Sequence, residues 1–455
     1  MGAKVYTERT FEDAVESVLL DHGWERGEPG NYNPELGIDS ADLAVFIGRT
    51  QAREWERLRA AYGEDPARPF ARLVAKEIDQ RGALDVFRQG VKDKGIRFRL
   101  AYFRPAHTLA AGALDEYNAN RCVVTRQLHF SGKDSDQSVD LAFFLNGIPV
   151  VSAELKNPLT GQTVAEARRQ YRERDPKELF FARRTLVHFA VDPDLVFLTT
   201  RLAGNKTRFL PFNTGSEGPG RSGAAGNPPP GESGYRTSYL WEQVLQRDNF
   251  LELLQQYLHI EDPDAKAGRA PSFKPFAAHT QPLIFPRFHQ WHAVKTLTAD
   301  ARARGAGENY LIEHSAGSGK SNTIAWLAHR LSTLHDDANE PVFDKVVVLT
   351  DRLVLDKQLQ DTIYQFEQVQ GVVEKIDTDS AQLAEALTGA RARIVITTQQ
   401  KFPYVLDKVR GLAARKYAII IDEAHSSQGG EDNAALKKAL GSRTVDESGD
   451  PLTSA

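Results

Sequence analysis

The chain has 455 residues, of which 41% are hydrophobic and 26% are charged, a balance typical of a folded globular protein that excludes a fibre or a disordered tail. Its length predicts more than one domain, at roughly 100–200 residues each. The formal net charge of −4 excludes a uniformly basic nucleic-acid-binding surface, so any such binding needs local basic patches.

The N-terminus and the cysteine content bear on the cellular compartment. The first residues lack the apolar segment of a signal peptide, and no run approaches the ~20 apolar residues of a membrane span. The single cysteine, Cys122, excludes an internal disulfide and is interpreted as a packed strand residue. These features predict a cytoplasmic protein without membrane contact.

The first half of the chain is predicted to begin with helices and continue with strands. Apolar residues at three- and four-residue spacing predict an amphipathic helix over 11–19, and a second helical stretch is predicted around 54–80. The pattern then changes to apolar, extended runs. Strands are expected over 123–130, 139–145 and 149–155.

The last two of these strands form a predicted hairpin that carries three charged residues. Asn146-Gly147, a strong hairpin signal, joins them. Strand alternation places Glu154 and Lys156 on one face, beside Asp140 across the ladder. Two carboxylates and a lysine on one hairpin resemble the site of PD-(D/E)xK nucleases.

The chemistry of such a nuclease requires these residue types. The carboxylates of Asp140 and Glu154 are hard oxygen ligands for Mg²⁺, and Lys156 can position water or stabilise phosphorane charge. Charges within apolar strands need a partner or a metal. The alternative is a structural ion pair between Lys156 and the carboxylates. A basic helical stretch over 165–174 follows, which suits a DNA backbone but also suits a solvated charged face.

The second half begins after a punctuated region. Residues 201–235 are rich in Gly, Pro and Ser and are predicted to be a linker or long loop, followed by a helix around 240–258. Helices then alternate with short strands expected over 310–313, 346–350, 394–398 and 418–422, which predicts a parallel sheet wrapped by helices. The predicted domains are 1–205, a connector over 206–280, and a RecA-like lobe over 281–455.

A nucleotide site is predicted where the 310–313 strand meets a helix. The glycines let backbone N–H groups surround the β-phosphate, the lysine reaches the β/γ-phosphates, and the serine hydroxyl can hold Mg²⁺. This loop departs from the general pattern at His314, which stands at the first glycine position. The loop residues are Gly317, Ser318, Gly319, Lys320 and Ser321.

Two further features complete the predicted ATP site. Asp422-Glu423 ends an apolar strand, where Asp422 can hold Mg²⁺ and Glu423 can orient the attacking water. Gln290 lies in a segment that resembles the adenine-recognising Q-motif, although a lone helical glutamine is usually solvated. Together with Ala424-His425, these motifs resemble superfamily 2 helicase motors. The sequence ends about thirty residues later, so a second motor lobe is expected to lie outside it.

Taken in order, the motifs resemble the restriction (R) subunit of type I restriction-modification enzymes. The matching segments are 125–130, 139–141, 146–149 and 154–158, followed by the motor motifs. The resemblance implies an α/β protein, with a PD-(D/E)xK restriction-endonuclease-like domain before a RecA-like helicase lobe. It implies an ATP- and Mg²⁺-dependent endonuclease and translocase that cleaves unmodified foreign double-stranded DNA, together with methyltransferase and specificity subunits.

The resemblance also assigns residues. By matching position, Asp140, Glu154 and Lys156 would be the nuclease residues. Glu12 would be the family's acidic residue on the first helix, although Glu8 and Glu16 compete for this place. In the family's Gln-x-x-x-Tyr motif Tyr171 would be the tyrosine, with Ala167 at the glutamine position and Gln170 beside the tyrosine.

Two other functions stay open. One is a superfamily 2 helicase or remodelling motor whose N-terminal domain binds DNA without cutting it. The other is a non-catalytic assembly module.

Overall fold

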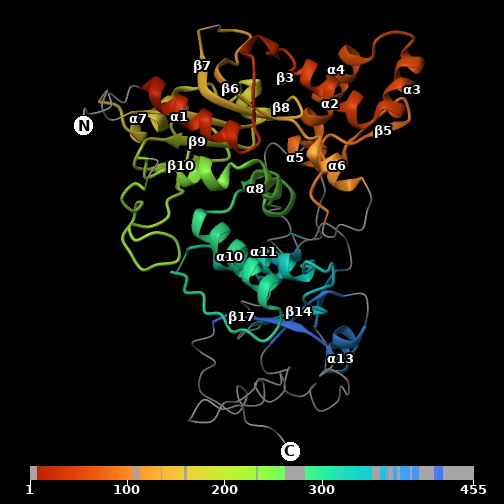
Figure 1. The fold of residues 1–455 in the computed structure, drawn as a ribbon, viewed down its shortest axis with the longest axis vertical. Helices are drawn as coiled ribbons and strands as arrows, with labels where there is room; N and C mark the ends of the chain where they lie inside the picture. The colour runs from red at the N-terminus through yellow and green to blue at the C-terminus, as the bar shows by residue number, and fades with distance from the viewer. Residues whose placement is uncertain are drawn as a thin grey trace, which may run out of the picture. The chain divides into compact units, whose positions relative to one another are not determined.

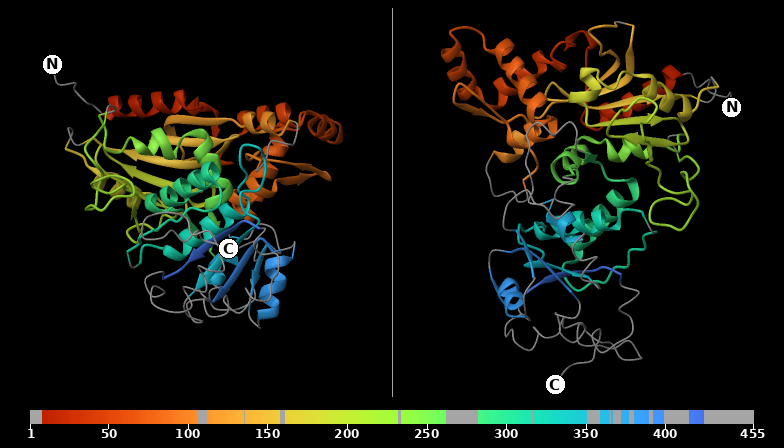
Figure 2. Two further views of the ribbon diagram at one scale, coloured as in Figure 1. Left: turned by 60° about the horizontal axis from the view of Figure 1, so that its bottom comes forward. Right: turned by 180° about the vertical axis from the view of Figure 1, so that it is seen from behind.

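The computed structural model describes residues 8–105, 112–134, 136–157, 161–231, 234–261, 282–315, 317–350, 359–364, 366, 372–376, 380–389, 392–398 and 415–423. The chain divides into two compact units, each with α/β architecture (Figure 1, Figure 2). Unit 1 comprises Met1–Pro263 and Pro271–His289, and unit 2 comprises Asp264–Ala270 and Gln290–Ala455. Within the described ranges, helices lack the combined length and apolar character needed to cross a membrane.

Unit 1 is built on a seven-stranded mixed sheet with the order β1-β6-β7-β8-β9-β10-β11. The pairs β1–β6 and β8–β9 are parallel, and the other neighbours are antiparallel. The strands are β1 (Glu25–Arg26), β6 (Cys122–His129), β7 (Ser138–Leu145), β8 (Ile148–Leu155), β9 (Val187–Val191), β10 (Val196–Thr199) and β11 (Leu210–Pro211). The three strands predicted over 123–130, 139–145 and 149–155 are confirmed to within about a residue.

Helices cover both faces of this sheet. Adjacent residues of a strand point to opposite faces of the sheet. On one face Ala142 packs in a cluster with Tyr171 of α7. On the other face the Phe143 ring lies with its centroid 5.1 Å from that of Trp24. The Trp24 indole donates to the Leu245 carbonyl at 2.7 Å, so the segment around 240–257 lies on that second face. The helices are α1 (Glu8–Asp21), α7 (Val164–Glu173), η3 (Phe180–Arg184), η4 (Leu240–Val244), α8 (Arg247–Glu252) and η5 (Leu253–Tyr257).

A helical extension of unit 1 lies beside the sheet (Figure 1). Its core contains Trp55, Phe70 and Phe98, with Phe70 and Phe98 ring centroids 4.9 Å apart. The single helical stretch predicted over 54–80 is two helices, because Gly63 ends the first and Pro66 precedes the second. The elements are α2 (Ser40–Thr50), α3 (Ala52–Tyr62), α4 (Ala67–Arg81), α5 (Ala83–Gln89), β4 (Val91–Asp93) and β5 (Ile96–Phe98).

The turn between β7 and β8 is packed inside unit 1. Asn146 is fully buried, and its amide group donates to Leu100 and Asn120 and accepts from the Arg121 N–H. Gly147 has φ 83°, and a Cβ there would stand 2.3 Å from the Asp39 carbonyl. Both residues of the predicted Asn-Gly turn adopt the left-handed backbone that such a turn needs, and Gly147 also leaves no room for a side chain.

The segment predicted as linker and connector, 206–280, contributes its described part to unit 1. Strand β11 joins the sheet beside β10, and the Tyr239 hydroxyl donates to the Phe212 carbonyl at 2.6 Å. The Trp241 ring packs against Phe11 of α1 at 5.7 Å. The first compact unit therefore extends beyond 205. Its small elements are η1 (Pro29–Asn31), β2 (Tyr32–Asn33), β3 (Ile38–Asp39), α6 (Ala113–Asn118), β12 (His259–Ile260) and β13 (Leu283–Ile284).

Unit 2 contains the predicted parallel sheet, with the order β15-β16-β14-β17. Every residue of β14 is buried, as expected for a strand covered on both faces. Its core joins Val347 and Leu349 to Val395 and to Leu383 and Leu387. The elements are α10 (Phe288–Arg304), α11 (Lys320–Ser332), β14 (Lys345–Thr350), β15 (Val373–Lys375), α13 (Ser380–Thr388), β16 (Ile394–Thr398) and β17 (Tyr417–Ile421).

The prediction of a strand over 310–313 is wrong. In the described structure these residues join no ladder, and Tyr310, Leu311 and Ile312 are 46%, 87% and 39% exposed. The Tyr310 hydroxyl instead donates to Asp300 at 2.6 Å. A run of three apolar residues forms a strand only when a neighbouring strand supplies ladder partners, and local sequence does not report that partner.

Candidate functional site

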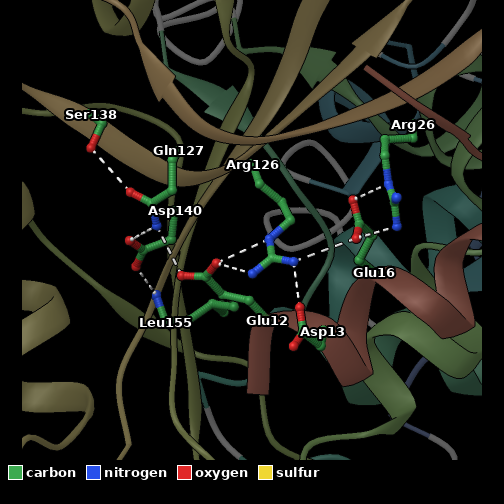
Figure 3. A network of polar contacts seen from close by, with 9 residues as sticks. All are labelled: Glu12, Asp13, Glu16, Arg26, Arg126, Gln127, Ser138, Asp140 and Leu155. Atoms are coloured by element: carbon green, nitrogen blue, oxygen red, sulfur yellow. Dashed lines mark hydrogen bonds and ion pairs between the residues drawn. The ribbon is translucent and has the colours of Figure 1, made fainter. Parts of the chain in front are cut away.

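The three charged residues of the β7–β8 hairpin come together as predicted. The Lys156 Nζ lies 3.7 Å from the Asp140 Oδ2. The same oxygen accepts a 2.7 Å bond from the Leu155 N–H, which Figure 3 shows. Asp140 and Lys156 are each 8% exposed, and Glu154 is fully buried. Two buried carboxylates and a lysine therefore lie at one end of the hairpin, within apolar strands that otherwise bury neutral side chains.

Glu154 is paired with an arginine that sequence reasoning did not assign to it. Arg174, directly after α7, donates to the Glu154 Oε1 at 2.9 Å and to the Ser138 carbonyl. Burial, followed by the charge of Asp140, raises the pKa of Glu154 to about 8, even though Arg174 and Lys156 act in the opposite direction. The structure thus favours a protonated Glu154 at neutral pH.

This raised pKa predicts a pH-dependent stability. Because the folded pKa of about 8 lies above the ordinary value of 4.5, the contribution of Glu154 to stability is complete below pH 4.5 and is lost as pH rises through 8. Glu154→Gln mimics the protonated form and should unfold at a higher temperature than wild type above pH 8, with the difference vanishing near pH 5. Thermal melts from pH 5 to 9 measure this, with Glu217→Gln as the control. A pH-independent difference would contradict it.

Helix α1 brings a third carboxylate to the site. The Glu12 Oε1 accepts from the Gln127 amide at 2.9 Å, and Gln127 also donates to the Asp140 Oδ1 at 3.2 Å (Figure 3). Arg126 donates two bonds to the Glu12 Oε2. Burial raises the pKa of Glu12; among the smaller causes, Arg126 lowers it and the charge of Asp140 raises it.

The competing acidic residues of α1 are placed differently. Glu16 pairs with Arg26 at 2.8 Å and lies 3.6 Å from Arg126 (Figure 3). The side chain of Glu8 lies outside the described set. Of the described side chains, Glu12 is therefore the α1 carboxylate connected to Asp140.

Tyr171 is buried in the core behind the hairpin. Its hydroxyl is 2.8 Å from the Ser152 Oγ, which is 2.8 Å from the His188 Nδ1. Burial raises the pKa of Tyr171 and lowers that of His188 to about 3, so both are neutral. Ala167 is buried on the same helix, and Gln170 is half-buried. Tyr171 thus anchors α7 to β8, two residues before Glu154.

The basic residues of the 165–174 stretch divide into three groups. Arg168 and Arg172 lie over aromatic rings, with the Arg168 guanidinium 4.6 Å from the Phe197 ring centroid. Arg169 is exposed and lies 3.7 Å from Glu173. Arg174 faces Glu154. Because Thr163 and Glu166 form a capping box, the start of α7 and hence the placement of these residues are fixed locally.

The residues present fit a Mg²⁺ site of few protein ligands. The Glu154 Oε2 is buried and accepts no hydrogen bond within the described structure, so it is an oxygen donor in need of a partner. Among the described residues no group of three or more His, Cys, Asp and Glu side chains is arranged to hold a metal. Mg²⁺ commonly binds one or two carboxylates and keeps several waters, which matches Asp140 and Glu154.

The predicted nucleotide loop of unit 2 opens α11. Gly317 and Gly319 have φ of 74° and 88°, and Ser318 is buried with its Oγ 3.1 Å from the His314 Nδ1. A Cβ at Gly319 would stand 2.5 Å from the Gln290 amide, which donates to the Gly319 carbonyl at 2.9 Å. Gln290 is buried against this loop, not solvated. The side chain of Ser321 is half-buried in the first turn of α11.

Lys320 reaches both acidic residues that follow β17. Its Nζ lies 2.9 Å from the Asp422 Oδ1 and contacts the Glu423 carboxylate. Burial is the largest single influence and lowers the pKa of Lys320, but the bonds to Glu423 and Asp422 together raise it above its usual value. The structure thus brings Lys320, Asp422 and Glu423 together as predicted. Ala424 and His425 lie outside the described residues.

Arg126, Gln127 and Arg174 are site residues that sequence reasoning did not single out. Arg126 and Gln127 lie in the segment 125–130, one of those that resemble the R-subunit family, and this resemblance was the signal that could have identified them. Arg174 stood among the basic residues of 165–174, where nothing local distinguished an arginine that faces a carboxylate.

Comparison with known families matches the two halves of the chain separately. Residues 5–214 match the family described as type I restriction enzyme R protein N terminus. Residues 289–451 match the SWI2/SNF2 ATPase family. The first match contains the hairpin site, and the second contains Lys320 and Asp422-Glu423.

Two curated relatives agree with these families. A protein of Methanocaldococcus jannaschii, named a type I restriction enzyme MjaIXP endonuclease subunit, is 24% identical over 341 residues, 66% of this chain. The type I restriction enzyme HindI endonuclease subunit of Haemophilus influenzae is 26% identical over 332 residues, 70% of this chain. The matched region spans 28% of the length of each relative.

Proposed function

We propose that the chain is the endonuclease and DNA translocase subunit of a type I restriction-modification system. The match of 5–214 to the type I restriction enzyme R protein N terminus family, the match of 289–451 to the SWI2/SNF2 ATPase family and the two similar endonuclease subunits support this proposal. It would cleave unmodified foreign double-stranded DNA, using ATP and Mg²⁺. The convergence of Asp140, Glu154 and Lys156 on one hairpin carries the proposal. Unit 1 would then contain a PD-(D/E)xK restriction-endonuclease-like domain.

In this proposal the carboxylates of Asp140 and Glu154 would bind the metal, and Glu12 would support Asp140 through Gln127. Mg²⁺, when bound, supplies a Lewis acid that polarises the scissile phosphodiester and lowers the pKa of a water. Lys156 donates to the phosphate oxygens or to the attacking water, which stabilises the negative charge that develops during hydrolysis. To bind the metal through its unpartnered Oε2, Glu154 would have to lose its proton, whereas Arg174 occupies the Oε1.

The chain's second unit would bind ATP as the RecA-like lobe of a motor. Backbone N–H groups of Gly317, Ser318 and Gly319 surround the β-phosphate, and Lys320 neutralises the β/γ-phosphates. Ser321 and Asp422 would hold Mg²⁺, and Glu423 would orient the attacking water. Gln290 contacts the adenine from its place against the loop. Lys320 would exchange its present carboxylate partners for phosphate oxygens.

The assembly proposed for this subunit includes methyltransferase and specificity subunits. The relatives are named endonuclease subunits of type I restriction enzymes, which supports a multi-subunit complex. The basic residues of α7 supply a place for the DNA backbone near the hairpin, with Arg169 exposed to solvent.

Asp140→Asn tests the nuclease proposal. The variant should lose Mg²⁺-dependent nicking of supercoiled DNA in the assembled complex, and calorimetry of the isolated chain should show loss of Mn²⁺ binding at unit 1. Asp134→Asn, at an exposed carboxylate of the β6–β7 connection, is the matched control and should behave as wild type. Equal Mn²⁺ binding by wild type and Asp140→Asn would overturn the proposal, whether or not nicking is observed.

A further inference from the structure

We propose that Gln127 is a positioning residue, whose amide fixes the carboxylates of Glu12 and Asp140 relative to each other. This inference rests on the proposed nuclease function. The Gln127 Nε2 donates to the Glu12 Oε1 at 2.9 Å and to the Asp140 Oδ1 at 3.2 Å (Figure 3). Its Oε1 accepts from the Ser138 Oγ at 3.2 Å, which orients the amide so that both N–H groups face carboxylates.

The backbone of Gln127 is strained in a way that this contact explains. Its φ is 47°, a left-handed conformation that is uncommon for a residue other than glycine. In a regular strand the neighbours Arg126 and Gln127 would point to opposite faces, yet both side chains bond Glu12. The left-handed residue is what lets two consecutive side chains reach the same carboxylate.

The core packing of β6 records the same irregularity. Val123 and Leu128 belong to one hydrophobic cluster, although five residues apart in a strand they would face opposite sides. The ladder pairs Arg126 with Leu141 and Leu128 with Val139, and no pairing joins the residues between them, Gln127 and Asp140. The interruption therefore falls on the residue proposed to bind metal and on the glutamine that bonds it.

Packing alone gives no reason for this strain. The Gln127 side chain is exposed, whereas Glu12 and Asp140 are buried, so the amide lies at the solvent side of the two carboxylates. A neutral amide can donate to two carboxylates without adding a charge that competes with a cation. Lysine or arginine would compete, and glutamate would repel both neighbours. Strain at an over-determined position beside ionisable groups is typical of functional sites.

Gln127→Gly separates positioning from structure. Glycine adopts φ 47° without strain, and this relief offsets the conformational entropy that glycine adds to the unfolded chain, so the thermal midpoint should stay close to that of wild type. Loss of the amide should weaken Mn²⁺ binding by about 10- to 100-fold, the usual effect of removing a group that orients a metal ligand. Raising the Mg²⁺ concentration should restore DNA nicking in the assembled complex, because the ligands themselves remain. Gln243→Ala, at an exposed glutamine of unit 1, is the matched control.

All variants are measured in an Asp422→Asn background, so that metal binding at the nucleotide site does not contribute. Gln127→Glu, which keeps the shape but replaces the donors with a carboxylate that can itself bind a cation, should change the Mn²⁺ affinity. Wild-type Mn²⁺ affinity in both variants, with binding lost in Asp140→Asn, would overturn the positioning role alone. Wild-type affinity in Asp140→Asn as well would overturn the nuclease proposal. A lower thermal midpoint for Gln127→Gly, with unchanged affinity, would show a structural role instead.

Discussion

Lys156→Ala is expected to reduce DNA cleavage by about 10²–10³-fold, the usual cost of removing one donor that stabilises transition-state charge. Binding of Mn²⁺ should be retained, because the carboxylates of Asp140 and Glu154 both remain. Removing the positive charge 3.7 Å from Asp140 leaves a buried carboxylate that a bound cation can neutralise. A cleavage defect with metal binding intact would distinguish Lys156 from the metal ligands.

Single-turnover cleavage in the assembled complex measures this effect, and Mn²⁺ binding is measured on the isolated chain. Lys133→Ala, at an exposed lysine of the β6–β7 connection, is the matched control and should cleave as wild type does. The structural alternative, an ion pair without catalytic role, predicts another pattern. Lys156→Ala would then lower the unfolding midpoint, Asp140→Asn would restore it in the double variant, and cleavage would follow stability.

Lys320→Ala should weaken ATP binding by about 10- to 100-fold, since a charge-assisted hydrogen bond contributes about 1.5–3 kcal/mol. ATP hydrolysis in the complex should fall to background, because the γ-phosphate loses its fixed cation. The thermal midpoint should change little, since the Lys320 side chain is 36% exposed and its ion pairs with Asp422 and Glu423 are partly screened by solvent.

Titration with a fluorescent ATP analogue measures the affinity. Lys416→Ala, at an exposed lysine just before β17, is the matched control. Unchanged affinity in Lys320→Ala would contradict the nucleotide site, which is the part of the chain that carries the SWI2/SNF2 match. Substitution of Lys320 should leave Mn²⁺ binding by unit 1 unchanged, because Lys320 and the hairpin residues belong to different units.

The hairpin could be predicted from sequence because its signals are local. Alternation, an Asn-Gly turn and two short apolar runs predict the hairpin, but its register shifts by one residue between Phe143 and Phe144. This shift, which no sequence signal predicted, is what brings Asp140 to the face of Lys156. The loop before Lys320 is equally local, since glycine spacing and a following helix define it. Asp422 and Glu423 were predicted in the same way, from the short apolar strand that ends just before them.

The contacts missed by sequence depend on elements distant in the chain. Arg174 is twenty residues from Glu154, and Gln127 is over a hundred from Glu12, so no periodicity relates them. The same reason explains the unpaired residues 310–313, whose apolar character predicted a strand without showing whether a partner existed. The Gly- and Pro-rich composition after 205 predicted loops correctly, yet did not show that aromatic residues such as Trp241 pack into unit 1.

The burial of the Asn146-Gly147 turn affects how fast Asn146 deamidates. In an open turn this dipeptide cyclises readily, because the glycine nitrogen can attack the asparagine side chain and release ammonia. Here the Asn146 amide is held by hydrogen bonds to Leu100, Asn120 and Arg121, which must break before the side chain can reorient to react. Deamidation at this position should therefore proceed only through molecules that have opened around the turn. The rate of deamidation at Asn146 would therefore measure how often the hairpin that carries Asp140 and Glu154 opens.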